Sequence, residues 1–487
     1  MAGAAGSAST QEPPEYDYLV VGGGIAGVSC AELLAQLHPE ASIALLTSSP
    51  CVKAVTDFSH LTQMLTSFQV AERGAEDWAR EQAPGVAVLK GSMLQLRPEA
   101  QTVVLDEGRQ LRYGRLSLCT GARPKVELRH PLVLGLRDTE SVVELQARLV
   151  TARRVVVLGN GGIATELVHE LEQVEVVWVI RDDTINSAFL DPGAGQFLKD
   201  KLQGQRQDIG VCRRARYSVG GEAGAGAHGS ALGPDWQLGL NAKGVASAKW
   251  VEMEHRSEVA EVLEPHQLGR LEPHTPQNWQ EPNFWPLYVR LTSGRVYGCD
   301  FVVSATGVVP QGAVLSSVLK VSAEGGVLVD DCLRTSCERV YAAGDLTTPG
   351  WDLAKHWLHM RLWTQARQMG RQAALSMVAD ARGEEVCQDF SFQMFAHVTK
   401  FFGYKVVLLG LFNGQKLDHQ YDILLRCTPG MEYVKVVMVD GRMQGAVLIG
   451  ETDLEETFEN LILNQLDLTS YGESLLDPDI DIDDYFD

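Results

Sequence analysis

Two stretches of sequence decide the fold: YLVVGGGIAG at residues 18–27 and VVVLGNGGIA at residues 155–164. In each, four apolar residues typical of a buried strand lead directly into the pattern G-x-G-x-x-(G/A), which opens a helix. This order places the pyrophosphate of a dinucleotide against a helix N-terminus, where free N–H groups and the helix dipole favour negative charge. One such pattern can be an ordinary tight turn, but two in the same context predict a chain that binds two dinucleotides.

The glycines of the first pattern have separate tasks. Gly22 permits the tight turn, Gly24 lets the backbone approach phosphate, and Gly27 lets the helix pack on the strand. The second pattern repeats this arrangement with Ala164 in the third position. The residues that we expect to bind the dinucleotides through these loops are Gly22, Gly24, Ile25, Ala26 and Gly27 in the first, and Gly159, Gly161, Gly162 and Ile163 in the second.

The adenosine ribose of each dinucleotide should lie at the end of the strand that follows each pattern. The acid expected about 20 residues after the first pattern is absent, and a hydroxyl, that of Ser48, is our candidate ribose ligand there. After the second pattern the strand ends in Arg181-Asp182-Asp183. Arg181 suits a 2′-phosphate and an aspartate suits a free 2′-hydroxyl, so this site is compatible with NADPH and with NADH.

Composition and charge exclude several functional classes. The chain has 487 residues and a net charge of −21, which argues against direct binding to nucleic acid or to an anionic membrane. Its apolar runs are too short to span a membrane, and the absence of Lys and Arg before Lys53 argues against a secretory or mitochondrial targeting segment. The nine cysteines form neither a disulfide framework nor a zinc site by their spacing. These features predict a protein of the cytosol or the nucleus.

The expected fold class is α/β, with two Rossmann-like dinucleotide-binding domains and a C-terminal α+β domain. The first dinucleotide domain is expected in two segments, residues 16–149 and 310–385. The second domain is expected at 150–309, with an insertion near 212–286 where the regular pattern degrades. The C-terminal domain, residues 386–487, ends in an acidic tail that is typical of an interaction segment or of a solvated terminus.

Three further motifs follow in order along the chain: Thr120-Gly121, Ala305-Thr306-Gly307 and Tyr341-Ala-Ala-Gly-Asp345. Together with the two glycine patterns they resemble the pyridine nucleotide-disulfide oxidoreductase family over about residues 18–370. The resemblance implies that the first fold binds FAD, that the second binds NAD(P)H, and that Asp345 bonds the ribityl chain of the flavin. It also implies that the motifs contribute cofactor-binding residues, namely Thr120, Gly121, Gly307 and Gly344.

The same resemblance points to residues beside the reacting rings. The stretch from Trp363 to Gly370 resembles the W-x-x-A-x-x-x-G helix of ferredoxin- and rubredoxin-reductase-like members, in which the tryptophan lies by the pyrimidine edge of the flavin. Glu166 would sit where the nicotinamide meets the flavin, so Glu166 and Trp363 are the candidate catalytic residues. Trp363 could instead be a core residue of an amphipathic helix. Lys53 could bond the flavin ring or diphosphate, or could be a surface lysine.

The cysteines depart from the family's pattern. A redox-active C-x₄-C pair should lie near residues 50–65, where Cys51 stands without a partner. Cys332 and Cys337 have the right spacing but precede the motif at the flavin chain, and we interpret them as core residues. The His-Pro general base of the disulfide reductases is absent from the C-terminal unit. We therefore expect a protein in which NAD(P)H reduces FAD but which lacks the redox-active cysteine pair.

Four stretches, Gly159–Gly162, Ser230–Trp236, Phe395–Phe402 and Gly450–Phe458, resemble one particular member of the family. The resemblance implies a protein of the nucleus and cytoplasm. This resemblance implies an FAD-dependent NAD(P)H oxidoreductase with slow NAD(P)H oxidase activity. It also implies a role in oxidative-stress defence and a protected protein partner, the tRNA ligase complex. The alternative is a redox-gated binding protein, similar to apoptosis-inducing factor, with a stable FAD–NAD(P) charge-transfer state and little turnover.

Overall fold

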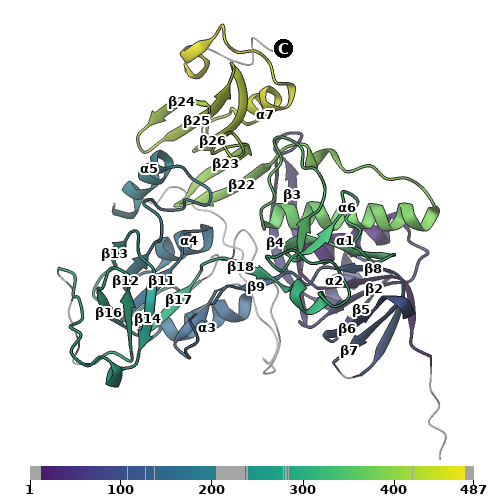
Figure 1. The fold of residues 1–487 in the computed structure, drawn as a ribbon, viewed down its shortest axis with the longest axis horizontal. Coiled ribbons are helices and arrows are strands. Elements are labelled where there is room, and N and C mark those ends of the chain that lie inside the picture. Colours follow the sequence, from purple (N-terminus) through teal and green to yellow (C-terminus); the bar gives the residue numbers. More distant parts are fainter. Residues whose placement is uncertain are drawn as a thin grey trace, which may run out of the picture.

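The structure is a computed structural model, and it describes residues 12–106, 108–126, 128–136, 138–203, 236, 240–277, 279, 282, 284–418 and 420–477. Two units built around parallel strands, each with antiparallel strands at its edge or beside it, and a C-terminal antiparallel unit make up the described part of the chain (Figure 1). This mixed α/β architecture confirms the predicted fold class.

The first parallel unit is built around the first glycine pattern. Its sheet has the order β5-β2-β1-β8-β7-β6, and β20 pairs with β8 in parallel, so the chain returns to this sheet after residue 310. Residues 18–21 of β1 are almost fully buried, since this central strand is covered on its faces. The elements are β1 (Glu15–Val21), α1 (Ile25–Leu37), β2 (Ile43–Thr47), α2 (Ala75–Glu81), β5 (Val86–Lys90), β6 (Met93–Arg97), β7 (Thr102–Leu105), β8 (Gln110–Leu118), β20 (Val340–Ala342) and α6 (Trp363–Arg382).

The second parallel unit is built around the second glycine pattern. Its sheet has the order β10-β17-β11-β12-β13, with a smaller antiparallel sheet, β14-β15-β16, beside it. The elements are β10 (Val133–Gly135), α3 (Thr139–Leu149), β11 (Arg154–Leu158), α4 (Gly162–Glu170), β12 (Glu175–Val179), α5 (Pro192–Gln203), β13 (Trp250–Glu254), β14 (Val259–Leu263), β15 (Leu287–Leu291), β16 (Val296–Cys299) and β17 (Phe301–Ser304).

Part of the range expected to be an insertion is regular structure. Strand β13 pairs in parallel with β12, and β14 pairs antiparallel with β15, so residues 250–263 belong to the sheets of the second unit. Both strands lie at sheet edges and are partly exposed. Their sequences therefore lack the continuous apolar run that is typical of a central strand. Residues 212–235 of the expected insertion, and the acidic tail from residue 478, lie outside the described residues.

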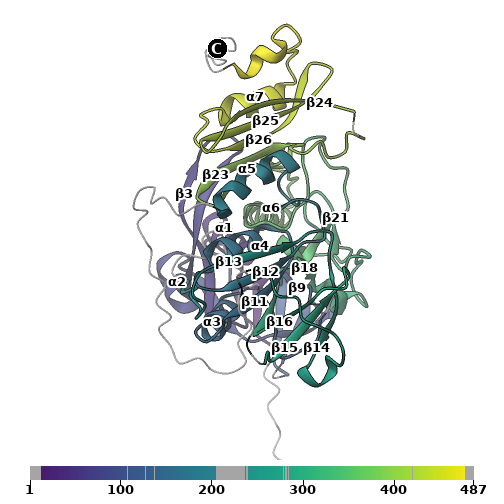
Figure 2. The ribbon, with the colours of Figure 1, turned by 90° about the vertical axis from the view of Figure 1, so that its left-hand side faces the viewer.

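The C-terminal unit is an antiparallel sheet of order β22-β23-β26-β25-β24 that carries α7. Figures 1 and 2 place it at one end of the molecule, next to α5. Strand β22 meets α4 of the second unit, and Phe401 and Phe402 at its end belong to the same apolar core as that unit. The elements are β22 (Ala396–Phe401), β23 (Tyr404–Gly410), β24 (Asp422–Thr428), β25 (Glu432–Val439), β26 (Arg442–Ile449) and α7 (Glu455–Asn464).

Short two-stranded sheets connect the units. The hairpin of β3 and β4 rises from the first unit toward the C-terminal sheet (Figure 1). At its tip the backbone N–H of Met64 donates to Oε1 of Glu459 on α7, at 3.0 Å. The remaining strands are β3 (Cys51–His60), β4 (Thr66–Gly74), β9 (Ala122–Pro124), β18 (Val308–Pro310), β19 (Val327–Val329) and β21 (Thr347–Pro349).

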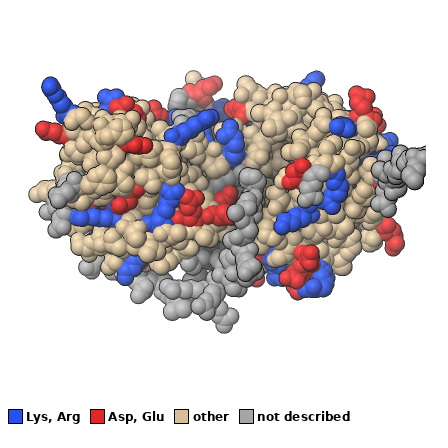
Figure 3. Space-filling model, turned by 90° about the horizontal axis from the view of Figure 1, so that it is seen from below, with Lys and Arg blue, Asp and Glu red and all other residues tan. Residues whose placement is uncertain are grey.

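Acidic and basic side chains are mixed on the face of the molecule that is seen from below in Figure 3. The chain as a whole carries a net charge of −21. A search of the described helices found none with both the length and the apolar character that crossing a membrane requires. The lack of a basic face for nucleic acid or an anionic membrane stays a prediction from the net charge.

Candidate functional site

A cavity of about 1210 Å³ lies between the two parallel units and the C-terminal sheet. Both glycine loops open on it, and so do the Thr-Gly turns at Thr120 and Thr306. The structure therefore brings together most of the site residues expected from the sequence. Those that line the cavity are Gly22, Gly24, Ile25, Ala26, Ser48, Thr120, Gly121, Gly159, Gly161, Gly162, Ile163, Glu166, Arg181, Gly307, Asp345 and Trp363.

The first glycine loop is shaped by close backbone packing. Gly22 has φ +125°, and a Cβ there would lie 2.2 Å from the carbonyl oxygen of Cys119, so the turn requires glycine. Gly24, by contrast, faces open space, with no atom within 4 Å of where its Cβ would stand. It is the N-cap of α1, and no side chain caps this helix. The helix N–H groups therefore face a space that a pyrophosphate could fill.

The second loop repeats this construction. Gly159 has φ +122°, and a Cβ there would lie 2.2 Å from the carbonyl oxygen of Ala305. Gly161, the N-cap of α4, again faces open space and again has no side-chain cap. The carbonyls of Cys119 and Ala305 each precede a Thr-Gly pair. Each Thr-Gly pair therefore lies where the end of a neighbouring strand packs against a glycine loop. The backbone of each loop leaves room for one dinucleotide.

Gly27 and Gly344 do not line the cavity but allow helices to approach it. A Cβ at Gly27 would lie 1.9 Å from the carbonyl oxygen of Gly22, and one at Gly344 would lie 2.8 Å from Cβ of Ala26. Gly370 of α6 is equally constrained, because its Cβ would lie 2.2 Å from the carbonyl oxygen of Ala26. The structure therefore gives these glycines a packing role behind the loop, and their direct contact with cofactor stays a prediction.

Opposite charges lie together at the expected ribose position of the second loop. Arg181 and Asp182 both line the cavity. Asp182 accepts hydrogen bonds from Asn160 Nδ2 at 2.9 Å and from Ser187 Oγ at 2.7 Å, and the bond from Asn160 contributes most to lowering its pKa. This wall therefore offers a cation for a 2′-phosphate and an anion for a 2′-hydroxyl, as the sequence indicated.

Glu166 lies on α4 at the cavity wall, 8% exposed. Its Oε2 accepts a hydrogen bond from the indole Nε1 of Trp236 at 2.6 Å. Trp236 also lines the cavity, although it comes from the range expected to be an insertion. The sequence contained no pattern that would have paired these residues, because Trp236 stands among glycines and polar residues with no periodicity.

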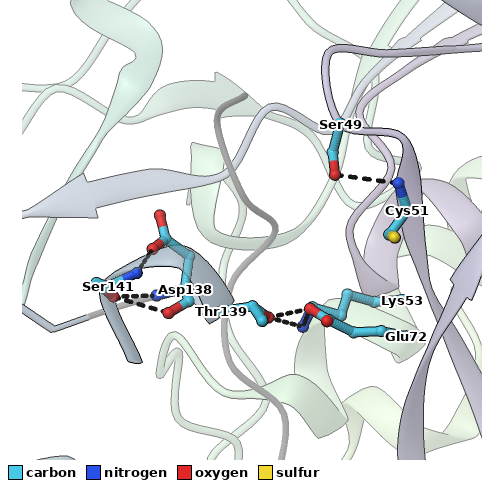
Figure 4. Close-up of polar contacts among 7 residues, drawn as sticks. All are labelled: Ser49, Cys51, Lys53, Glu72, Asp138, Thr139 and Ser141. Atoms are coloured by element: carbon cyan, nitrogen blue, oxygen red, sulfur yellow. Dashed lines mark hydrogen bonds and ion pairs between the residues drawn. The ribbon is translucent and has the colours of Figure 1, made fainter. Parts of the chain in front are cut away.

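The position of Lys53 excludes one of its two sequence-based interpretations. It is 4% exposed, so the alternative of a surface lysine is wrong, and it does not line the cavity. Its Nζ forms an ion pair with Glu72 of β4 and donates to Thr139 Oγ1 at 3.1 Å (Figure 4). Thr139 begins α3, whose N-cap is Asp138. Lys53 thus links the β3–β4 hairpin to α3, and a bond to flavin stays a prediction.

Trp363, the first residue of α6, lines the cavity beside a histidine that the sequence analysis did not select as a site residue. The ring centroids of Trp363 and His397 lie 5.0 Å apart. His397 comes from β22 of the C-terminal sheet and is 1% exposed. No local pattern in the sequence could show that β22 reaches this cavity.

The position of each cysteine relative to the cavity decides whether its thiol could exchange electrons with a cofactor bound there. Cys119 lines the cavity, and burial raises its pKa to about 12, so it remains a thiol at neutral pH. Cys332 and Cys337 do not line the cavity. Their Sγ atoms contact different carbonyl oxygens, that of Val386 at 3.6 Å and that of Val318 at 3.4 Å.

Comparison with known proteins agrees with this geometry. The family model described as "Pyridine nucleotide-disulphide oxidoreductase" matches residues 16–219 and 248–370. Similar curated proteins are named "Pyridine nucleotide-disulfide oxidoreductase domain-containing protein 1". The human one is 46% identical over 99% of this chain and 100% of its own length. The Dictyostelium discoideum one is 35% identical over 96% of this chain and 99% of its own length.

Solved structures share the fold at low sequence identity. A chain of the covalent putidaredoxin reductase–putidaredoxin complex superposes with a TM-score of 0.62, at 16% identity, over 93% of this chain and 94% of that one. A NAD-dependent persulfide reductase from A. fulgidus superposes with a TM-score of 0.64, at 17% identity, over 93% of this chain and 78% of that one. At such identities the likeness concerns the fold alone.

Proposed function

We propose a function from the premise that the chain belongs to the pyridine nucleotide-disulphide oxidoreductase family. It is accordingly an oxidoreductase that depends on FAD and NAD(P)H. Beyond this, we propose that it oxidises NAD(P)H slowly and transfers electrons from the flavin without a redox-active cysteine pair of its own. We further propose that it acts in oxidative-stress defence, in the nucleus and cytoplasm, and protects a protein partner, the tRNA ligase complex.

One observation carries the redox part of this proposal. Both glycine loops open on a single cavity, whereas the C-x₄-C thiols of Cys332 and Cys337 do not line it. Cys119 is the single cysteine among the described residues of the cavity wall, and its raised pKa makes it a poor nucleophile. An outlet through cysteine is therefore poorly supported by the geometry, and oxygen or an external acceptor is the better-supported destination for the electrons.

The residues of the chain have distinct tasks in this scheme. FAD bound at the first loop would accept the two electrons that NAD(P)H, bound at the second loop, delivers as hydride. Gly24 and Gly161 leave room for the pyrophosphates at the two helix N-termini, so that the ring ends of both dinucleotides can share the cavity. Glu166, oriented by Trp236, and Trp363 line the cavity and would border the rings.

A redox-gated binding protein is the second candidate, and one contact favours it. The hydrogen bond from Trp236 to Glu166 connects the cavity to a segment that the family model does not match, residues 220–247. A change of charge at the rings could thereby alter a surface that binds a partner. Partner protection is compatible with both candidates, so turnover distinguishes them.

Anaerobic mixing of the flavin-loaded protein with NADH or NADPH, followed by air, tests the proposal. We expect reduction of the flavin and then slow reoxidation by oxygen, with no acceleration by a disulfide acceptor. A long-wavelength band that persists for minutes in air would favour the redox-gated candidate. Rapid reduction of an added disulfide would contradict the proposed absence of a cysteine outlet.

The cysteines supply a matched control for this experiment. The double variant Cys332→Ser/Cys337→Ser should retain the flavin and the NAD(P)H oxidation rate of the unsubstituted protein. A loss of turnover with the flavin retained would show that this pair carries electrons after all. Partner protection is tested separately, by asking whether the purified protein with NAD(P)H preserves tRNA ligase activity under oxidation. No protection relative to a flavin-free sample would overturn that part.

A further inference from the structure

His397 combines deep burial with an unused hydrogen-bonding atom. Its Nδ1 is hydrogen-bonded with Thr364 Oγ1 at 3.1 Å, whereas its Nε2 is buried and has no partner among the described residues. Buried polar atoms in proteins are almost always paired, so an unpaired one at a cavity wall points to a group that is bound there. His397 is among the residues that line the dinucleotide cavity.

The chemistry of this ring is well defined. Burial lowers the pKa of His397 to about 3, so the imidazole is neutral at physiological pH. A neutral imidazole has one N–H donor and one acceptor nitrogen, and the contact with Thr364 occupies the Nδ1 position. Nε2 therefore offers one uncharged hydrogen bond, as a donor or as an acceptor depending on the tautomer.

The surroundings of His397 suit a planar ring. On one side lies Trp363, at 5.0 Å between centroids, and on another lies Phe189, at 6.3 Å and nearly parallel. Phe189 and Phe401 both line the cavity and adjoin the second glycine loop, since a Cβ at Gly162 would lie 3.4 Å from Phe401 and 3.6 Å from Phe189. His397 thus stands between the start of α6 and the loop of α4, where the ring ends of two dinucleotides can meet.

We propose that Nε2 of His397 is a binding contact for the carbonyl or amide edge of a heteroaromatic ring held in this cavity. Two sources present such an edge: the carboxamide of nicotinamide and the pyrimidine edge of flavin. Either one satisfies the unpaired nitrogen, and the aromatic neighbours hold the plane of the ring. The inference deepens the proposed function because it concerns the same cavity, but it requires neither oxidase turnover nor a protein partner.

The test uses the flavin-loaded, full-length protein and two substitutions that remove Nε2. His397→Phe keeps a flat ring against Trp363, and His397→Asn keeps a polar group for Thr364 but cannot reach the Nε2 position. The measured quantities are the Kd for NAD⁺ and for NADP⁺, from perturbation of flavin absorbance, and the midpoint potential of the bound flavin. None of these requires turnover, so a failure of the oxidase proposal would not affect them.

The two possible sources give different results. If the contact is to nicotinamide, both substitutions should raise the Kd of the preferred oxidised dinucleotide roughly three- to tenfold, the loss expected for one hydrogen bond. The flavin potential should then stay unchanged. If the contact is to flavin, the midpoint potential should shift and the dinucleotide Kd should stay unchanged. In either case His397→Gln, whose amide reaches the Nε2 position, should recover part of the loss.

His356 supplies the matched control. It is also a buried histidine, but its Nε2 is paired with Gln444 Oε1 at 3.0 Å, and it does not line the cavity. His356→Phe should lower thermal stability and leave both Kd and potential unchanged. If His397→Phe and His397→Asn also leave both quantities unchanged, His397 only fills space between aromatic rings and the proposal is overturned.

Discussion

The two glycine loops have the same backbone design but different surroundings. In each, a glycine of strongly positive φ passes over a carbonyl oxygen, and a second glycine opens on the shared cavity. Two more glycines around the first loop leave no room for a side chain. A Cβ would lie 1.9 Å from the nearest backbone oxygen at Gly27 and 2.2 Å from it at Gly370. This loop is part of a close-packed core in which α1 and α6 cross almost in backbone contact.

The second loop is less constrained. Its third position is Ala164 rather than glycine, and a Cβ at Gly162 would meet its nearest atom, in the ring of Phe401, at 3.4 Å. Side chains from other parts of the chain, including Trp236 and His397, complete this side of the cavity. From this contrast we expect the first loop to hold its dinucleotide more firmly than the second loop does.

The largest effect is expected from adding a single methyl group to the first loop. Gly27→Ala would place a Cβ within 1.9 Å of the Gly22 carbonyl oxygen, and backbone cannot yield as a flexible side chain can. We expect purified protein without flavin, measured as the ratio of absorbance at the flavin band to that at the protein band. The reverse change in the second loop, Ala164→Gly, should leave flavin content intact. Full flavin content in Gly27→Ala would refute the difference between the loops.

A smaller effect is expected from the side chains that complete the second loop. Trp236→Phe removes the indole N–H that bonds Glu166, a hydrogen bond worth about 1 kcal/mol. We expect the rate of flavin reduction by NAD(P)H, followed by stopped-flow absorbance, to fall roughly fivefold while flavin content stays unchanged. Trp250→Phe, at a partly exposed edge strand away from the cavity, is the control and should have no effect. Equal rates for both variants would show that Trp236 does not orient Glu166.

The smallest effect concerns pH and His397. Because its pKa in the folded protein is lowered to about 3, the unfolded chain binds a proton below about pH 6.5 and the folded one does not. This group therefore makes stability fall as the pH falls through 6.5 toward 3, and its influence fades above about pH 7.5. Between pH 7.5 and 6.0 we expect His397→Phe to gain about 0.8 kcal/mol relative to the unsubstituted protein. The difference in Tm at the two pH values measures this gain, and a constant difference would contradict it.

Local patterns predicted the parts of the site that are themselves local. A glycine at a tight turn after a buried strand can be recognised from the sequence alone. The loops at Gly22 and Gly159 and the Thr-Gly turns accordingly lie where we expected them. The contacts that complete the site join distant segments. Nothing near Lys53 indicates its pairing with Glu72 and Thr139, and those contacts depend on how a hairpin meets α3.

Local sequence patterns also failed to predict the sides of the cavity and the strands at the sheet edges. His397 enters the site because the C-terminal sheet packs on α4, a tertiary arrangement that periodicity within β22 does not encode. Strands β13 and β14 were hidden in the expected insertion because edge strands carry mixed polar and apolar residues. Fold class and phosphate-binding loops could therefore be derived from sequence, and the groups around the reacting rings required the structure.

We expect the two loops to hold two different dinucleotides in one cavity, with FAD at the first loop. Matched variants at the two open positions, Gly24→Val and Gly161→Val, test it most directly, because each fills a space that is empty within 4 Å. Flavin content and reduction by NADH, NADPH and dithionite are measured for both. We expect Gly24→Val to be colourless, and Gly161→Val to stay yellow and to be reduced by dithionite but not by NADH or NADPH. Retention of flavin by Gly24→Val, or normal reduction of Gly161→Val by NAD(P)H, would contradict it.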